Sequence, residues 1–322
     1  MKILVTGGAG FIGSHLCDLL ISKGEEVVVI DDLSTGSLEN IAHLNSHPRF
    51  EYHVDTILNT DLMDLLIAKC DCVVHLAAAV GVKYVLENPL SSIETNILGT
   101  ETALKTANKY GKKIIVASTS EVYGKHMHAP LKEDDNLIYG PPSTMRWSYA
   151  ASKLVDEFTA LAYYRTKKLD TIIIRCFNTI GPRQTGLYGM VVPRFIQQAL
   201  RDDPITVFGD GTQTRTFTYI DDVTTAIYKL LTCGKGAGEV VNIGGTEEIT
   251  IADLAKKIKE LANSNSEIVF IPYDKAYGKD FEDMMRRVPS VEKLQALTGY
   301  APETSLDEIL LKTIEYFRAK AY

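Results

Sequence analysis

Short apolar runs alternate with helix-like segments along the first 178 residues. Runs such as KILVTG, EVVVID and KIIVAST are nearly continuous in apolar residues. Continuous apolar strands separated by helices are typical of a parallel sheet covered on both faces. We therefore expect an α/β fold built on a Rossmann-type doubly wound parallel sheet. The expected strands span 2–7, 26–31, 50–55, 72–78, 113–119 and 170–178, and the expected helices span 11–23, 58–69, 92–110 and 148–168.

The composition and the length of the expected elements change after Asn178. Stretches such as GPRQTGLYG, FGDGTQTR and GKGAGE interrupt shorter elements, and Gly and Pro at this density mark loops. We expect one domain over residues 1–180 and a smaller α/β region over 181–322. The boundary is expected to be interleaved, because the strand-like run EVVNIGG at 239–245 is able to rejoin the first domain.

Composition excludes several classes of protein. The net charge of −7 argues against nonspecific nucleic-acid binding. Five cysteines without a CxxC pair fit reduced thiols better than disulfides or zinc, so we expect no metal site. Met1 runs directly into KILVTGG, and no apolar run approaches the ~18 residues of a membrane span. These features predict a cytoplasmic protein that does not bind a membrane.

A glycine-rich turn joins the first expected strand to the first expected helix. Gly7, Gly10 and Gly13 stand in this turn. Glycines here let the backbone approach a pyrophosphate and let the helix pack against the sheet, while the helix N-terminus attracts negative charge. A glycine triplet alone is weak evidence, but its place between a strand and a helix is the context that dinucleotide binding requires.

Carboxylates follow the second and third expected strands. Asp31 and Asp32 end the second strand, where a carboxylate accepts the ribose hydroxyls of NAD and repels the 2′-phosphate of NADP. The turn therefore favours NAD, although Asp31 could also simply cap a loop. Asp55 follows the third strand and is a candidate for contact with the adenine, although Asp is common in turns.

Tyr149 precedes Lys153 by four residues in the segment RWSYAASK. On a helix these side chains are surface neighbours, and an ammonium close to a phenol is expected to lower the tyrosine pKa toward the range of a general base. Spacing alone decides nothing, because Tyr163 precedes Lys167 and Tyr164 precedes Lys168 in the same way.

Several motifs together resemble the extended short-chain dehydrogenase/reductase family, in its branch of NAD-dependent nucleotide-sugar epimerases, decarboxylases and dehydratases. The resemblance covers nearly the whole chain, with the motifs in family order. They are TGGAGFIG, HLAA at 75–78, STSEVYG at 118–124, YAASK at 149–153 and GDGTQTRTFTYIDD at 209–222.

The resemblance assigns catalytic roles to three residues. It implies that Tyr149 removes the proton of the sugar 4-hydroxyl, that Thr119 hydrogen-bonds the same oxygen, and that Lys153 stabilises the phenolate and holds the nicotinamide ribose. A fold that binds NAD without catalysis is a second reading, which the presence of all three residues disfavours. The cofactor contacts that it implies, with those expected from the turn, are Gly7, Gly10, Phe11, Ile12, Gly13, Asp31, Asp32, Asp55, Ala77, Asn96, Tyr149 and Lys153.

The residues after Thr119 bear on the reaction. Dehydratases of this family carry Asp-Glu there, whereas this chain has Ser120 and Glu121, so dehydration is disfavoured. Ser-Glu and Arg287 in RRVPS resemble UDP-glucuronate decarboxylases, in which the arginine lies near the sugar carboxylate and the glutamate repels it. The longer segments RWSYAASK, GPRQTGLYGMVVPRF and YDKAYGKDFEDMMRRVP resemble 4-epimerases of UDP-glucose, UDP-galactose or UDP-glucuronate. We expect a UDP-sugar 4-epimerase, with UDP-glucuronate decarboxylase as the alternative.

The second region is expected to bind the nucleotide sugar, since arginine donates paired hydrogen bonds to oxyanions. The resemblance alone favours UDP over dTDP. It also implies a homodimer formed through helices at 96–110 and 150–168, although these faces could simply cover the sheet. The candidate substrate contacts are Asn178, Arg183, Val192, Arg194, Arg215 and Arg287.

Overall fold

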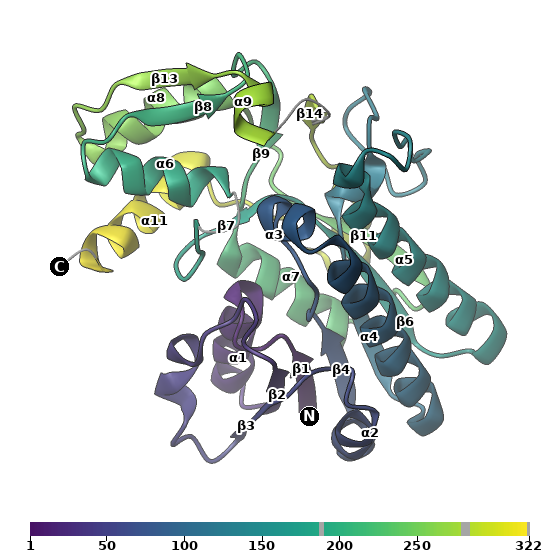
Figure 1. Cartoon of the computed structure of the whole chain (residues 1–322). Coiled ribbons are helices and arrows are strands. Elements are labelled where there is room, and N and C mark those ends of the chain that lie inside the picture. Colours follow the sequence, from purple (N-terminus) through teal and green to yellow (C-terminus); the bar gives the residue numbers. More distant parts are fainter. Residues whose placement is uncertain (187–189, 278–283, 321–322) are drawn as a thin grey trace.

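Seven parallel strands form the central sheet of the computed structural model, which describes residues 1–186, 190–277 and 284–320 (Figure 1). Their order is β11-β6-β5-β4-β1-β2-β3, so the chain reverses its direction across the sheet between β1 and β4. In such sheets ligands bind at the carboxyl ends of the strands beside this switch point. The predicted fold class is confirmed. The strands are β1 (Lys2–Thr6), β2 (Glu26–Asp31), β3 (Phe50–Val54), β4 (Cys72–His75), β5 (Lys113–Thr119), β6 (Thr171–Cys176) and β11 (Glu239–Ile243).

Helices cover both faces of the sheet. Residues of β2 show why, because Val27 and Val29 pack on one face while Val28 and Ile30 pack on the other. Each such buried side chain contributes about 1.5–3 kcal/mol of hydrophobic stabilisation. One face carries α1 (Phe11–Ser22), α7 (Ile220–Thr232) and α10 (Glu292–Thr298), and the other carries α2 (Thr60–Lys69), α4 (Pro89–Tyr110) and α5 (Ser148–Lys167).

Two helices begin where local chemistry places them and not where the apolar pattern starts. The Asn59 side chain accepts the backbone N–H of Leu62 and so caps α2, which begins at Thr60 and not at residue 58. Helix α4 begins at Pro89, three residues before the predicted start, because the fixed φ of proline suits a first helical position.

A second layered region lies above the sheet in Figure 1, with a core of its own. Strand β11, at 239–243, returns from this region to pair with β6 at the edge of the main sheet. The division of the chain at residue 180 stays a prediction. The region's strands are β7 (Thr179–Ile180), β8 (Ile205–Phe208), β9 (Thr214–Thr216), β10 (Thr218–Tyr219), β12 (Glu248–Thr250), β13 (Ile268–Ile271) and β14 (Arg286–Arg287), and its helices are α6 (Val191–Leu200), α8 (Ile251–Ala262), α9 (Tyr273–Tyr277) and α11 (Leu306–Lys320).

Short elements connect these layers near the carboxyl ends of the strands. Among them, η3 follows β5 directly, η4 leads into α5, and α3 lies between β4 and α4. These three elements border the site described below. The short elements are η1 (Leu38–Asn40), η2 (Ala42–Leu44), α3 (Val82–Glu87), η3 (Ser120–Tyr123) and η4 (Met145–Trp147).

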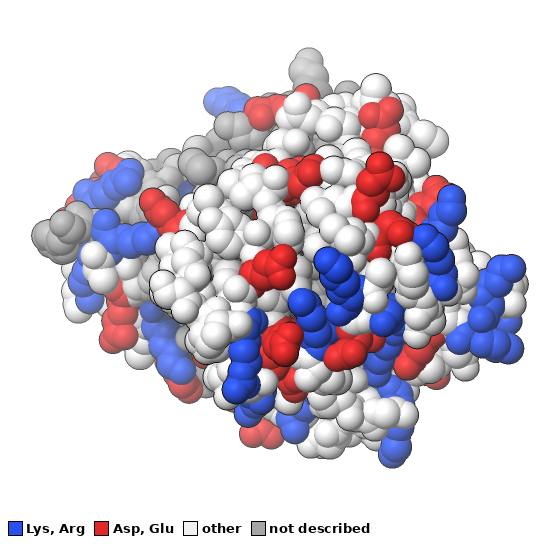
Figure 2. Space-filling view, turned by 90° about the horizontal axis from the view of Figure 1, so that it is seen from below, with Lys and Arg blue, Asp and Glu red and all other residues white. Residues whose placement is uncertain are grey.

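The surface carries mixed charge. On the face seen in Figure 2, Lys and Arg side chains alternate with Asp and Glu side chains. Within the described ranges, no helix has both the length and the apolar composition needed to cross a bilayer. The cytoplasmic location stays a prediction.

Candidate active site

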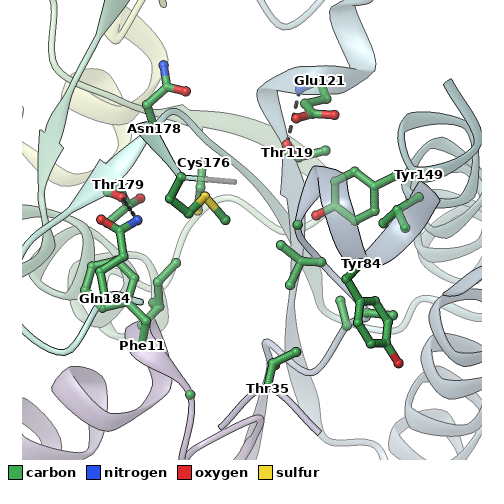
Figure 3. Close-up of a pocket in the computed structure, with 18 of the residues that line it drawn as sticks. Phe11, Thr35, Tyr84, Thr119, Glu121, Tyr149, Cys176, Asn178, Thr179 and Gln184 are labelled. Carbon is green, nitrogen blue, oxygen red and sulfur yellow. Dashed lines mark hydrogen bonds between the residues drawn. The ribbon is translucent and has the colours of Figure 1, made fainter. Parts of the chain in front are cut away.

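A cavity opens at the carboxyl ends of β1, β2, β4, β5 and β6, between the main sheet and the second region. Segments far apart in the chain meet in its wall, as Figure 3 shows for residues near Phe11, Thr119, Tyr149 and Asn178. This is the position that the switch in strand order predicts for a ligand.

The glycine turn forms one end of the cavity. Gly7 has a φ of +72°, and a Cβ on it would lie 2.9 Å from the backbone nitrogen of Ala77. A Cβ on Gly13 would lie 2.1 Å from the Gly7 carbonyl oxygen, so only glycine allows α1 to approach β1 this closely. Helix α1 has no side-chain cap at Gly10, which leaves its first N–H groups available to an anion. Phe11 and Ile12 also line the cavity.

Asp31 and Asp32 lie beside the glycine turn. The Asp31 carboxylate is 8% exposed and accepts the N–H groups of Ala9 at 2.9 Å and Leu33 at 2.8 Å. Burial raises the pKa of Asp31, while these two hydrogen bonds oppose the rise. Asp32 accepts the Ser34 N–H at 2.9 Å and lines the same wall. The turn and the carboxylates together form a cradle suited to a dinucleotide.

Asp55, Asn96 and Arg183 are not among the residues that line the cavity. Asp55 accepts hydrogen bonds from the Thr56 N–H and the Asn59 side chain at the start of α2. Asn96 accepts the Ala79 N–H at 2.8 Å, so it supports the cavity loop after β4 from behind. Arg183 forms an ion pair of 2.8 Å with Asp18. The structure therefore gives all three side chains local structural contacts, whereas Ala77 lies in the wall.

Thr119, Tyr149 and Lys153 meet at the other end of the cavity. Figure 3 shows the Tyr149 hydroxyl directed toward the end of β5, which carries Thr119. The Thr119 hydroxyl accepts the Glu121 N–H at 3.2 Å and so fixes the turn into η3. The sequence pattern thus brings these three side chains together in the folded chain.

The predicted direction of the Tyr149 pKa shift is wrong for the protein on its own. Burial foremost, and the charge of Glu121 second, raise the pKa of Tyr149 above its usual value, whereas a lowered pKa was predicted. Lys153 donates a hydrogen bond of 2.7 Å to Asp156, a carboxylate that the sequence argument did not include. The charge of the Lys153 ammonium is therefore partly balanced by Asp156.

Glu121 lies between two buried arginines. Its Oε2 atom accepts a hydrogen bond of 2.5 Å from Arg146, and its Oε1 atom lies 3.8 Å from a guanidinium nitrogen of Arg287. Arg287 also donates to the Ser120 hydroxyl at 3.3 Å and to the Asn178 side chain at 3.0 Å. Both arginines are less than 10% exposed, so this cluster places fixed charges of both signs in the cavity wall.

Val192, Arg194 and Arg215 line the cavity wall of the second region. The Arg194 guanidinium lies 3.8 Å from the ring centroid of Phe208, and Arg215 donates to the Thr214 carbonyl at 2.8 Å. Residues 187–189 and 278–283, which belong to two motifs used in the sequence argument, lie outside the described residues.

Sequence reasoning missed several residues of the cavity wall. Arg146 stands in a quoted motif but had no assigned role, and Tyr84 comes from the short helix α3. Thr179 Oγ1 and Gln184 Oε1 are buried, and the described part of the chain offers them no hydrogen-bond partner. Figure 3 shows both beside Phe11, where they are available to a ligand. Gln184 belongs to the quoted segment GPRQTGLYG but had no assigned role, and no motif marks Thr179, because the loop after β6 acquires its position only in the folded chain.

A buried histidine lies behind the site. The ring of His75 contacts the hydroxyls of Thr6 at 2.9 Å and Thr100 at 3.2 Å. Burial, with a smaller contribution from the charge of Lys153, lowers the pKa of His75 to about 3. His75 is therefore neutral at physiological pH, and its role in the folded chain is to connect hydroxyl groups.

This pKa predicts a loss of stability in mild acid. The unfolded chain takes up the His75 proton with an ordinary pKa of about 6.5, so stability present above that pH is lost as the pH falls toward 3. Between about pH 7 and about pH 5, His75 should lower the free energy of unfolding by about 2 kcal/mol. Urea unfolding of wild type and His75→Gln at both values tests this. An equal acid sensitivity of the two proteins would contradict it.

Comparison with known proteins identifies the family. A family described as GDP-mannose 4,6 dehydratase matches residues 4–313, nearly the whole chain. The chain belongs to the extended short-chain dehydrogenase/reductase family, in its group of NAD-dependent nucleotide-sugar epimerases, decarboxylases and dehydratases.

Individual relatives are similar over the full length. A UDP-N-acetyl-alpha-D-glucosaminuronate decarboxylase of Bacillus cytotoxicus is 41% identical, with 98% of each chain covered. The UDP-glucuronic acid decarboxylase 1 of Danio rerio is 37% identical, with 98% of this chain and 72% of that protein covered. The crystal structure of UDP-glucuronic acid 4-epimerase from Bacillus cereus, in complex with UDP-glucuronic acid and NAD, is 34% identical, covers 100% of both chains and has a TM-score of 0.90.

Proposed function

We propose that this enzyme decarboxylates a UDP-hexuronate through a 4-keto intermediate, with NAD as its cofactor. The observation that carries the proposal is the position of Glu121 between Arg146 and Arg287, in the same cavity wall as Thr119 and Tyr149. The similarity to two uronate decarboxylases supports the same choice.

The residues at the glycine turn fit NAD. The space that a Cβ would fill at Gly7 and Gly13 is occupied by backbone atoms, and Asp31 is held at the cavity wall by two N–H groups. Gly10, Phe11 and Ile12 would lie along the pyrophosphate, and Asp31 would accept the adenosine ribose hydroxyls. When bound, NAD supplies a hydride acceptor for C4 of the sugar and returns the hydride at the end of the cycle.

Tyr149 and Thr119 would act on the 4-hydroxyl of the sugar. The Tyr149 phenolate takes the hydroxyl proton, and Thr119 holds the same oxygen. Arg146 opposes the effect of Glu121 on the pKa of Tyr149, because its positive charge favours the phenolate. The product of this step is a 4-keto hexuronate, which is a β-keto acid.

Loss of CO2 then requires charged side chains placed around the sugar carboxylate more than a covalent bond between enzyme and substrate. The C5–C6 bond breaks, its electron pair moves into the C4 carbonyl, and the resulting enolate takes up a solvent-derived proton at C5. Arg287 would hold the sugar carboxylate, and Glu121 would repel it, which raises the energy of the acid relative to the transition state. The Tyr149 and Thr119 hydroxyls would stabilise the enolate oxygen by hydrogen bonds.

Epimerisation at C4 is the second candidate function. The longer sequence segments around Tyr149 and Arg287 favour it, and a 4-epimerase structure is 34% identical to this chain. The decarboxylase relatives extend to 41% identity over the same length and favour the alternative. An epimerase that acts on an acid must also suppress CO2 loss, whereas Glu121 beside a bound carboxylate would promote it.

Product analysis tests the proposal. The purified protein is incubated separately with UDP-glucuronate, UDP-N-acetylglucosaminuronate and UDP-glucose, and the products are identified by mass spectrometry. We expect release of CO2 and a UDP-pentose from at least one of the two acids. A product of unchanged mass with inverted C4 would overturn the decarboxylase assignment in favour of the epimerase.

The proposed assembly is a homodimer formed through α4 and α5, which lie side by side in Figure 1. Four large apolar side chains are exposed on these helices, namely Leu90, Leu98, Val155 and Phe158, of which Phe158 is 64% exposed. Such exposed apolar residues on adjoining helices are typical of an interface.

Phe158→Glu should therefore convert the protein to a monomer, because it places a charge in the proposed apolar interface. Sedimentation velocity measures the change. Leu311→Glu, on the remote helix α11, is the matched control and should leave the assembly unchanged. A wild-type protein that sediments as a monomer would contradict the proposed dimer.

A further inference from the structure

We propose that Asp156 is a positioning residue for Lys153 and Tyr149, and that it sets the pH at which Tyr149 works. This inference rests on the proposed function, in which Tyr149 is the general base. It concerns a carboxylate that lies behind the cavity wall and does not line the cavity.

Asp156 and Lys153 form a buried ion pair within α5. The Lys153 ammonium donates to the Asp156 Oδ2 atom at 2.7 Å, and the two side chains are 3% and 1% exposed respectively. Their spacing of three residues puts both on the face of the helix that points toward the sheet. A buried carboxylate at this distance restricts the direction of the ammonium, because no water is available to replace it.

A row of polar groups leads from Asp156 to the opposite side of the sheet switch point. Burial raises the pKa of Asp156, while Lys153 foremost and Thr100 after it oppose the rise, and the Thr100 hydroxyl contacts the ring of His75 at 3.2 Å. The other ring nitrogen of His75 contacts the Thr6 hydroxyl at 2.9 Å, and this hydroxyl accepts the Ala77 N–H at 3.2 Å.

The hydrogen bonds of this chain all run in one direction, from Ala77 toward Thr100. Ala77 donates to Thr6, so the Thr6 hydroxyl is free to donate to Nδ1 of His75, and Nε2–H of His75 then donates to Thr100. The Thr100 hydroxyl therefore accepts from His75, and Thr100 favours the charged form of Asp156. Only the neutral Nε2–H tautomer of His75 satisfies this order. Asp156 therefore lies beside the end of this chain, where it accepts the hydrogen bond of the Lys153 ammonium.

The charge of Asp156 acts on Tyr149. Burial foremost, and the charge of Glu121 from η3 second, raise the pKa of Tyr149, and the negative charge of Asp156 acts in the same direction. The positive charge of Arg146 from η4 acts in the opposite direction. The other titratable groups that face this end of α5 are Lys153 and Glu157 on the helix itself, His75 on β4 and Cys176 on β6. Among these groups, Asp156 is the carboxylate that directly holds Lys153.

The test replaces the carboxylate with an amide of the same shape. In Asp156→Asn the charge is lost, so the Tyr149 phenolate becomes easier to form, and the acid limb of the kcat/KM profile should move to lower pH by about one unit. Glu157→Gln is the matched control. Glu157 lies on the same helix, is 3% exposed and pairs with Arg175 at 2.7 Å, so its loss removes an equally buried ion pair that does not include Lys153.

The outcomes separate a positioning role from a purely structural one. The inference requires that the acid limb of the kcat/KM profile shifts in Asp156→Asn and stays unshifted in Glu157→Gln. It is overturned if both variants lose thermal stability while neither limb moves. Asp156→Ala removes the same charge and replaces Asp156→Asn if the amide variant does not fold.

A second measurement does not depend on turnover. Tyrosinate absorbance of the NAD-bound protein is titrated in wild type and Asp156→Asn, and subtraction of the corresponding Tyr149→Phe protein isolates Tyr149. A Tyr149 transition at lower pH in Asp156→Asn than in wild type supports the inference. If the same protein decarboxylates no UDP-hexuronate, only the proposed function is refuted. An unchanged transition overturns the inference even in an active decarboxylase.

Discussion

Tyr149→Phe should lower turnover of a UDP-hexuronate by about 10²–10⁴-fold while the protein still binds NAD. The phenylalanine ring keeps the packing of α5 but cannot accept the proton of the 4-hydroxyl. Turnover is measured as release of CO2, and NAD binding is measured by calorimetry. Nearly normal turnover would show that another group is the base.

Tyr163→Phe is the matched control for this variant. Tyr163 precedes Lys167 with the same spacing, on the same helix, but does not line the cavity. Its replacement should leave turnover close to that of the wild type. The comparison therefore tests whether the position in the cavity, and not the tyrosine–lysine spacing, makes Tyr149 reactive.

Glu121→Gln should reduce CO2 release by about a hundredfold, because it removes a negative charge beside the bound carboxylate. The amide keeps the size of the side chain and leaves an oxygen for Arg146. Oxidation at C4 does not need this charge, so the 4-keto acid should accumulate and be trapped by borohydride. If CO2 release stays close to the wild-type rate, Glu121 has no part in the decarboxylation step.

The fold was predictable because the apolar runs, the glycine turn and the motifs all indicate the same structure. Val27 to Ile30 form an unbroken apolar run, which is typical of a strand buried on both faces. Gly7 and Gly13 stand where backbone atoms leave no space for a Cβ, so the turn is also fixed locally. The proposed catalytic residues Thr119, Tyr149 and Lys153 follow from motifs that keep their place relative to these elements.

The surroundings of the site were not predictable, because they join residues distant in the sequence. Arg146 reaches Glu121 across 25 residues, and Arg287 reaches Ser120 across 167. The sequence also does not tell whether a polar side chain serves a ligand or a structural contact, as Asp55 and Arg183 illustrate. The raised pKa of Tyr149 depends on burial, which becomes known only from the packed structure.

The most direct test of the account is the reaction, in D2O, of whichever of UDP-glucuronate and UDP-N-acetylglucosaminuronate the protein turns over, followed by NMR. Decarboxylation requires a solvent-derived proton at C5, so we predict CO2 and a UDP-pentose that carries one deuterium at C5. A UDP-hexuronate with inverted C4, an intact carboxylate and no deuterium at C5 would contradict it, and would show that the cavity performs epimerisation instead.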